Sequence, residues 1–353
     1  MNNKMTICFF GRYDNEYSRN RILIKGLGEN DVKVIECRTE LKGVKKYFDL
    51  IKKHWKLRKE YDVLFVAFPG YQAMILARFL TRRKIIFDSF APLYESEVLD
   101  RGNTKKGSFK ARYYWYLDKF SAKWANLVLL DTNEHIKYFI QEFGFNPSAD
   151  GGKFERIFIG SEPEFFSPQE KYQKINQKFI IHYHGNDIPL QGVKYILESA
   201  KLLEKYPDIQ FNFVGPRLKR RYANKGFNNI NFVGHVPYEQ MGKYINQSDI
   251  CLGIFGDTNK TQRVIPNKLY ECVACQKPTI TADTPAIREL FNENSLELIP
   301  IADSKALENT ILALKNKPNK MENLAKNGYN VFIKNGTPLI LGSELKKIAQ
   351  RLI

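Results

Sequence analysis

The stretch from Arg263 to Glu289 constrains the fold more than any other part of this sequence. Pro266 suits the first position of a helix, where a missing N–H costs nothing, and this helix is expected to run to about Gln276. A short apolar strand then covers residues 279–282. Thr284 can cap the next helix through its hydroxyl group. The pattern predicts a helix–strand–helix unit whose polar residues gather at the start of the first helix.

That helix start is a predicted anion site. Pro266 is followed by Asn267 and Lys268, so free backbone amides and one ammonium group lie at the positive end of a helix. Glu271 lies about one turn further along the helix. The same residues also fit a plain structural unit in which Glu271 merely suits the helix dipole. Spacing alone does not decide between these two interpretations.

The segment P-N-K-L-Y-E-C-V-A-C-Q-K-P-T-I-T resembles the nucleotide-sugar motif of family 4 glycosyltransferases, which retain anomeric configuration and have the GT-B fold. The resemblance implies that Pro266, Asn267 and Lys268 meet the donor diphosphate and that Glu271 holds the ribose hydroxyls. A carboxylate suits that task because it accepts two hydrogen bonds at once. Many members carry an earlier Glu where this chain has Arg263, which is a further candidate for donor binding.

The length of 353 residues favours two domains. The resemblance implies an α/β protein with two Rossmann-like domains that face each other across a cleft. We expect residues 1–165 to form an N-terminal acceptor domain and residues 170–335 a C-terminal nucleotide-sugar donor domain. Residues 338–353 are expected to form a last helix that crosses back to pack on the first domain.

Two strand ends in the first domain carry candidate site residues. The apolar strand 5–11 ends in a loop without a full G-x-G-x-x-G, so a dinucleotide fingerprint is not supported. The resemblance places Gly11 and Arg12 of this loop in the cleft, as further candidates for donor binding. Many family members carry a His near the position of Asp88, which is suited to orient or deprotonate an acceptor hydroxyl. The alternative for Asp88 is a loop carboxylate that caps the next segment.

A loop in the second domain departs from the family pattern. It contains Gly185, Asn186 and Gln191, where the family usually has an Arg after the Gly and a Lys before the next Gly. Those cations bind the diphosphate, which needs positive charge or amides. Lys268 and Arg263 are candidates to replace them. We therefore expect a substituted donor site, although a catalytically silent homologue is the alternative.

No metal site is evident from the sequence. His182 and His184 alternate on a strand and share one face, but no third or fourth ligand is apparent. His184 is close enough to the Gly185 loop to contact a donor, and the resemblance places backbone groups near Val236 at the nucleobase. The chain has no D-x-D triplet, which predicts metal independence and no cofactor. Cys272 and Cys275 form a C-x-x-C, and both are expected to be buried free thiols.

The net charge of +17 requires an acidic partner, either nucleic acid, anionic lipid or a phosphorylated substrate. No signal peptide and no apolar run near 18 residues is present. We therefore expect a cytoplasmic protein that does not span a membrane.

The segment 41–60 has the pattern of a basic amphipathic helix. Apolar residues from Val44 to Trp55 share one face, and eight basic residues stand against the single acid Asp49. This pattern fits an anionic membrane surface, whereas the alternative is an apolar face packed on the sheet beside solvated lysines. A second basic and aromatic cluster, residues 105–116, favours the membrane.

Together these observations predict a retaining, metal-independent glycosyltransferase. It would move a sugar from a nucleotide-diphosphate sugar to a lipid-linked or membrane-associated glycan acceptor, at the inner face of a membrane, as in cell-surface polysaccharide assembly. A GT-B nucleotide-sugar epimerase is one alternative. A basic nucleic-acid-binding protein is another, although the positive charge is spread widely and no compact nucleic-acid motif is visible.

Overall fold

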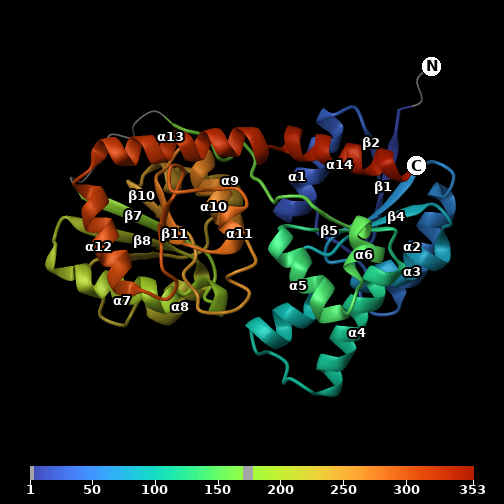
Figure 1. Cartoon of the computed structure of the whole chain (residues 1–353), viewed down its shortest axis with the longest axis horizontal. Helices are drawn as coiled ribbons and strands as arrows, with labels where there is room; N and C mark the ends of the chain where they lie inside the picture. Colours follow the sequence, from blue (N-terminus) through green and yellow to red (C-terminus); the bar gives the residue numbers. More distant parts are fainter. Residues whose placement is uncertain (1–3, 170–177) are drawn as a thin grey trace. The chain divides into compact units, whose positions relative to one another are not determined.

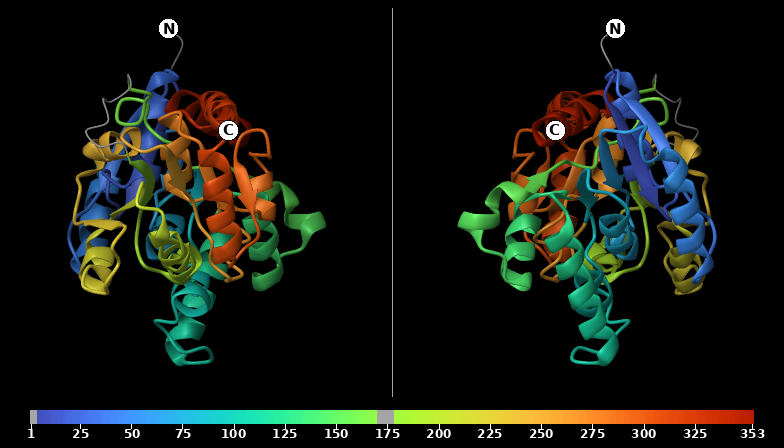
Figure 2. Two further views of the ribbon diagram at one scale, coloured as in Figure 1. Left: turned by 90° about the vertical axis from the view of Figure 1, so that its left-hand side faces the viewer. Right: turned by 90° about the vertical axis from the view of Figure 1, so that its right-hand side faces the viewer.

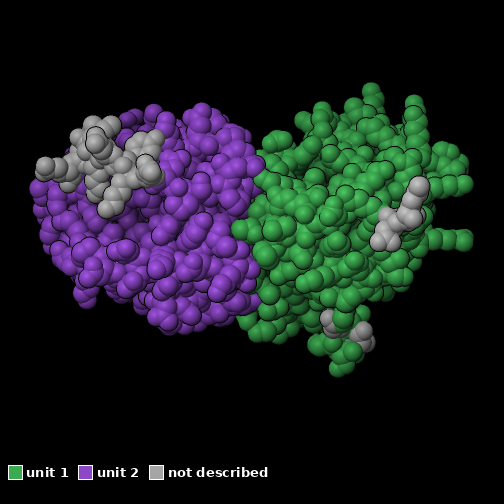
Figure 3. Space-filling view, turned by 90° about the horizontal axis from the view of Figure 1, so that it is seen from above, with its two compact units in different colours: residues 1–159, 337–353 green, residues 160–336 purple. Residues whose placement is uncertain are grey.

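The computed structural model describes residues 4–169 and 178–353, and the chain divides into two compact units (Figures 1 and 3). Unit 1 combines residues 1–159 with 337–353, and unit 2 comprises residues 160–336. The boundary follows Ile159, and the predicted start of the second domain at residue 170 lies outside the described residues.

Unit 1 contains a six-stranded parallel sheet in the order β2-β1-β3-β4-β5-β6. The central strands are almost wholly apolar and buried, as in sheets that are covered on both faces. The strands are β1 (Thr6–Gly11), β2 (Lys33–Arg38), β3 (Val63–Val66), β4 (Lys84–Asp88), β5 (Leu127–Leu130) and β6 (Phe154–Arg156).

Helices cover both faces of this sheet. The order of the strands reverses at β1, so right-handed crossovers place the first helix on one face and the following helices on the other. Leu50, Met74, Leu117 and Phe139, each from a different helix, share one core with the sheet. The helices are α1 (Ser18–Glu29), α2 (Lys45–Leu57), α3 (Tyr71–Leu80), α4 (Phe109–Trp124), α5 (Asn133–Phe143), α6 (Pro147–Asp150) and α14 (Pro338–Leu352), with a π-helical segment at Glu95–Asp100.

The C-terminal helix α14 packs directly on α1 (Figure 1). A Cβ atom added to Gly342 would lie 2.0 Å from the carbonyl carbon of Gly26, so the two backbones touch. Neither position has room for a side chain. This contact makes α14 part of unit 1 although it follows unit 2 in the sequence.

Unit 2 has a second six-stranded parallel sheet, in the order β12-β11-β10-β7-β8-β9. Its strands are β7 (Phe179–His184), β8 (Ile209–Val214), β9 (Ile230–Val233), β10 (Ile250–Leu252), β11 (Thr279–Ala282) and β12 (Glu297–Ile299). Its helices are α7 (Val193–Leu202), α8 (Pro216–Tyr222), α9 (Tyr238–Asn246), α10 (Asn267–Ala274), α11 (Pro285–Arg288), α12 (Ser304–Lys315) and α13 (Pro318–Asn335).

The helix–strand–helix unit predicted for residues 263–289 is confirmed as α10, β11 and α11. The Thr284 hydroxyl caps α11 by accepting a hydrogen bond from the Ile287 amide, at 3.3 Å. One detail differs, because Pro266 is the N-cap of α10 rather than its first helical residue. Its extended backbone, with φ −71° and ψ 148°, turns the chain into the helix.

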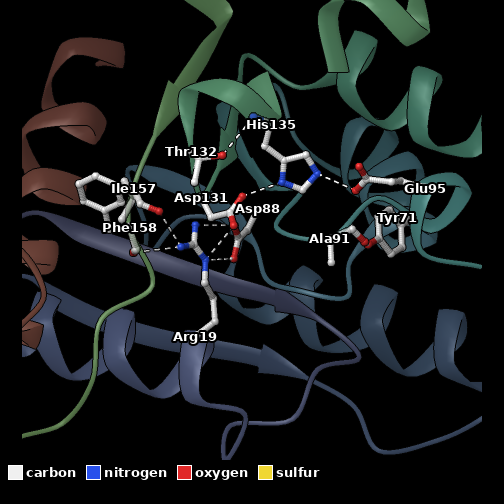
Figure 4. A network of polar contacts seen from close by, with 10 residues as sticks. All are labelled: Arg19, Tyr71, Asp88, Ala91, Glu95, Asp131, Thr132, His135, Ile157 and Phe158. Atoms are coloured by element: carbon white, nitrogen blue, oxygen red, sulfur yellow. Dashed lines mark hydrogen bonds and ion pairs between the residues drawn. The ribbon is translucent and has the colours of Figure 1, made fainter. Parts of the chain in front are cut away.

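Buried charges join the strand ends of unit 1 (Figure 4). Arg19 of α1 donates to both carboxylate oxygens of Asp88, at 2.9–3.2 Å, and neither side chain has exposed surface. The same guanidinium donates to the carbonyls of Ile157 and Phe158, at 2.8 and 3.1 Å. Arg19 therefore ties α1 to the end of β4 and to the segment after β6.

A second buried group lies beside this pair (Figure 4). His135 Nδ1 contacts Asp131 at 2.6 Å, and His135 Nε2 contacts Glu95 at 2.9 Å. Burial alone lowers the pKa of His135, but the two carboxylates outweigh it and raise this pKa to about 9. The imidazolium ion is thus the stable form at neutral pH, and it holds the π-helical segment against α5.

We predict a pH-dependent contribution of His135 to stability. Its folded pKa of about 9 lies above the ordinary value of 6.5. The stabilisation is therefore complete below about pH 6.5 and is lost as the pH rises through 9. Denaturation of the wild type and His135→Gln from pH 6 to 10 should give a difference in unfolding free energy that shrinks as the pH rises. A difference independent of pH would contradict this, and His235→Gln, at an exposed histidine, is the matched control.

Candidate functional site

The strongest candidate site lies where the strand order of unit 2 reverses. Strand β7 pairs with β8 on one side and with β10 on the other. The loop at Gly185 follows β7, and α10 begins after the loop that follows β10. In open α/β sheets, ligands bind at such switch points, beyond the carboxyl ends of the strands.

A chain of buried side chains links these two elements. His182 Nε2 lies 2.8 Å from His184 Nδ1, and His184 Nε2 lies 2.7 Å from Glu271 Oε2. All three side chains are buried. The prediction that both histidines share one face of the strand is confirmed, and this face meets α10 at Glu271, one turn into the helix.

When both imidazoles are neutral, the contacts define one arrangement of the protons. A Glu271 carboxylate accepts only, so His184 Nε2 carries the proton and His184 Nδ1 accepts. His182 must then donate from Nε2, which leaves its Nδ1 as an acceptor. That atom is buried without a hydrogen-bond partner among the described residues. Burial, with His184 and Lys268 nearby, lowers the pKa of His182 well below its usual value, as a neutral imidazole requires.

Lys268 lies on the other side of the helix start. Its ammonium group donates to Gln191 Oε1 and stands 3.8 Å from the centre of the Tyr183 ring. The Tyr183 hydroxyl donates to the same Gln191 oxygen, at 3.0 Å. A Cβ atom on Gly185 would lie 2.8 Å from Lys268 Nζ, and Gly185 has φ +146°. Only glycine fits this close approach without strain.

The environment makes Lys268 sensitive to its ligands. Burial lowers its pKa to about 7, against the opposing influence of Cys272 and Glu271. Near neutral pH the group therefore exchanges easily between amine and ammonium. An anion beside it favours the ammonium form. The amides at the start of α10 and the helix dipole favour an anion at the same place.

The structure thus brings together Gly185, Gln191, Lys268 and Glu271, four of the predicted donor-binding residues, on the loop after β7 and on α10. The other predicted positions in unit 2 differ in burial. Asn186 is exposed, without a side-chain hydrogen bond among the described residues, whereas Arg263, Asn267 and Val236 are half-buried and Pro266 is buried. Sequence reasoning missed His182 as a partner of the site, since its role depends on the pairing of β7 with β10.

In unit 1, Asp88 lies beneath the surface rather than at it. Its carboxylate has no exposed area and both oxygens accept from Arg19. This arrangement does not favour direct contact with an acceptor hydroxyl and matches a structural role. Gly11 is buried at the end of β1, with φ +135°.

Arg12, the remaining predicted residue, borders a cavity of about 180 Å³ between α2, α3 and α4. Lys46 of α2 donates to Gln72 Oε1 of α3 at 2.6 Å, and Gln72 donates to the Tyr113 hydroxyl of α4 at 2.9 Å. Burial, followed by the charge of Arg12, lowers the pKa of Lys46. Two cations that repel each other in one cavity form a candidate anion site. It could not be predicted, because it depends on how three helices pack.

Within residues 4–169 and 178–353 no group of three or more His, Cys, Asp or Glu side chains is arranged to hold a metal ion. All five cysteines are buried and free, so the prediction of free thiols at Cys272 and Cys275 is confirmed.

Comparisons with known proteins concern the fold and part of the sequence. A family described as glycosyl transferase-like matches residues 194–338, which include α10. The sequence matches no curated protein. Among solved structures, sucrose-phosphate synthase from Thermosynechococcus elongatus is similar with a TM-score of 0.74, at 13% identity over 99% of both chains.

Two further structures cover nearly the whole chain. HepE from Anabaena, in complex with UDP and glucose, has a TM-score of 0.72 at 14% identity, over 99% of this chain and 100% of that one. A glycosyltransferase from Rickettsia africae has a TM-score of 0.69 at 14% identity, over 99% of both chains. The predicted α/β fold is thereby confirmed, and this chain has the GT-B fold of glycosyltransferases, with a glycosyl transferase-like sequence over residues 194–338.

Proposed function

We propose that this protein is a glycosyltransferase that uses a nucleotide-diphosphate sugar. The observation that carries the proposal is the pair of oppositely charged groups at the start of α10. Lys268 and the helix amides form an anion site beside Gly185, and one turn along the helix the Glu271 carboxylate is fixed by His184. A nucleoside diphosphate carries matching groups in the same order, with an anionic diphosphate for Lys268 and the amides and a ribose diol for the Glu271 carboxylate.

UDP is the first nucleotide to test. HepE has the same fold and was solved with UDP and with UDP-glucose. In our proposal the diphosphate lies at the α10 amides, with Lys268 turning from Gln191 to the phosphates. Glu271 accepts hydrogen bonds from the ribose hydroxyls. Arg263, Asn267 and Asn186 border the same helix start and loop and are proposed to contact the donor, with Val236 near the base.

The proposed chemistry needs neither a metal ion nor a protein nucleophile. Charge that develops on the departing diphosphate is stabilised by Lys268 and by the amides, which point at it before the reaction begins. The acceptor attacks from the same face as the leaving group, and a phosphate oxygen takes the acceptor proton. Configuration is then retained. Asp88 takes no direct part in this scheme, because Arg19 occupies both of its carboxylate oxygens.

The proposed acceptor carries an anionic group. The cavity bordered by Arg12 and Lys46 in unit 1 provides two cations for a phosphate, as found in a lipid-linked glycan. No helix in the described parts of the chain is long and apolar enough to cross a bilayer. We propose that the protein works on a membrane-associated acceptor at the inner face of the membrane, in the assembly of a surface glycan.

Glu271→Ala should weaken the binding of both UDP and uridine by roughly 1–3 kcal/mol, since both ligands carry the ribose and a charged hydrogen bond is lost. Calorimetric titration of each ligand measures this. Glu322→Ala, at an exposed position of α13, is the control and should change neither affinity. Unchanged UDP affinity in the Glu271 variant would remove the ribose assignment.

Lys268 should give UDP binding a defined pH dependence. Its pKa of about 7 in the free protein rises when the diphosphate binds, so the complex takes up a proton above that pH. Affinity should fall as the pH rises from 7 to 9, by up to about tenfold per pH unit. Lys268→Ala should abolish this slope and leave uridine binding unchanged, whereas the exposed-lysine variant Lys201→Ala keeps the slope. Affinity independent of pH in the wild type would contradict a phosphate role for Lys268.

A further inference from the structure

The apolar face of α2 is exposed in the described part of unit 1. Val44, Phe48 and Trp55 expose 67%, 69% and 66% of their surface, and Ile51 of the same stripe is also exposed. The helix packs on the sheet through Leu50 and its neighbours on the opposite flank. The alternative interpretation of segment 41–60, with this apolar face packed on the sheet, is therefore wrong.

A stripe of positive charge runs beside the exposed apolar stripe. At 3.6 residues per turn, Lys45, Lys52 and Lys56 project next to Val44, Phe48, Ile51 and Trp55, and all three lysines are exposed. The single acidic residue of the helix, Asp49, pairs with Lys53 at 2.8 Å. The flank that borders the apolar stripe is therefore net positive.

A neighbouring helix repeats this pattern. In α4, Phe109, Tyr113, Tyr116 and Phe120 follow one another at intervals of three or four residues and are all exposed, Phe109 by 90%. Lys105, Lys106, Lys110 and Arg112 lie in or next to the start of the helix and are exposed. Both views of Figure 2 show this segment, in teal, extending beyond the sheet of unit 1.

Hydrogen bonds through Gln72 link α2, α3 and α4 into one layer on the same face of the sheet. Two helices of this layer therefore present aromatic and aliphatic side chains bordered by lysine and arginine. Water solvates such apolar surface poorly, and large exposed apolar patches mark interaction sites.

We propose that α2 docks unit 1 on an anionic lipid bilayer. The stripe of Val44, Phe48, Ile51 and Trp55, called the docking stripe below, enters the boundary between headgroups and acyl chains. Lys45, Lys52 and Lys56 contact the anionic headgroups. An amphipathic helix that combines a large apolar face with lysines binds membranes in this way. The net charge of +17 supports a negatively charged partner.

This inference deepens the proposed function, because it names the surface through which the protein reaches a membrane-associated acceptor. To that extent the inference rests on the proposed function. The evidence for the docking stripe is independent of the donor site, because no residue of the donor site contributes to the stripe. Bilayer binding and nucleotide binding can therefore fail independently. Loss of UDP binding with intact vesicle binding would reject the function and retain the docking surface, and the reverse result would reject the surface alone.

The test is co-sedimentation of the whole protein with vesicles. The wild type should bind mixed phosphatidylglycerol–phosphatidylcholine vesicles and bind pure phosphatidylcholine weakly, with binding that decreases as salt is added. The double variant Phe48→Ser/Trp55→Ser should reduce the partition coefficient by about tenfold or more, because two large apolar side chains are lost. Circular dichroism and UDP titration check that this variant folds.

Two further variants separate the contributions. Lys45→Gln/Lys52→Gln/Lys56→Gln should remove most of the salt-dependent part of binding. Leu202→Ser/Ile333→Ser, at apolar positions of unit 2 that are 40% and 41% exposed, is the matched control and should bind like the wild type. Quenching of tryptophan fluorescence by brominated lipid should be lost in Trp55→Phe.

Two results would overturn the proposal. One is equal binding of the wild type and the Phe48→Ser/Trp55→Ser variant to the anionic vesicles. The other is self-association that this variant abolishes, measured by analytical ultracentrifugation, combined with no vesicle binding by the wild type. The stripe would then be an interface between two copies of the chain.

Discussion

The contact between Glu271 and His184 is the interaction on which the candidate site depends. A carboxylate taken out of water is costly unless it is hydrogen-bonded, and here an imidazole at the end of β7 meets that need at 2.7 Å. The pairing of β7 with β10 makes the contact possible, because it brings the start of α10 beside the end of β7. The same arrangement places Lys268 against Gly185, where any larger residue would collide with the ammonium group. The order of the strands, Gly185 and the buried groups Glu271 and Lys268 therefore depend on one another in shaping the site.

Unit 1 uses buried charge differently. Both carboxylate oxygens of Asp88 accept hydrogen bonds from Arg19, and His135 is held between Asp131 and Glu95. Breaking such a pair by removing one partner leaves an uncompensated charge, which costs several kcal/mol. These groups hold loops and strand ends in place, and their charges are already paired within the protein. In unit 2, Lys268 has only a neutral amide oxygen as its hydrogen-bond acceptor among the described residues, which an anionic ligand can replace.

Local sequence signals predicted a large part of the fold. The strand at 279–282 has the bounds that its apolar run indicated, and Thr284 caps its helix as its residue type predicts. The sequence could not show which side chains would be buried together. Asp88 is the last residue of a strand, where active-site carboxylates also lie, and only the fold reveals that Arg19 pairs with it. The apolar periodicity of α2 fits both a helix whose apolar face packs on the sheet and one whose apolar face is exposed. Only the structure distinguishes the two, because it shows that α2 packs on the sheet through Leu50, on another side of the helix.

The most direct test of the donor site is a crystal structure of the protein grown with UDP and a metal chelator. The account predicts diphosphate oxygens within hydrogen-bond distance of the first amides of α10 and of Lys268 Nζ, with the ribose hydroxyls on Glu271. The Lys268–Gln191 contact should then be broken. A nucleotide bound elsewhere, or bound with the diphosphate away from α10, would contradict the account. So would a complex that forms only when a divalent metal ion is supplied.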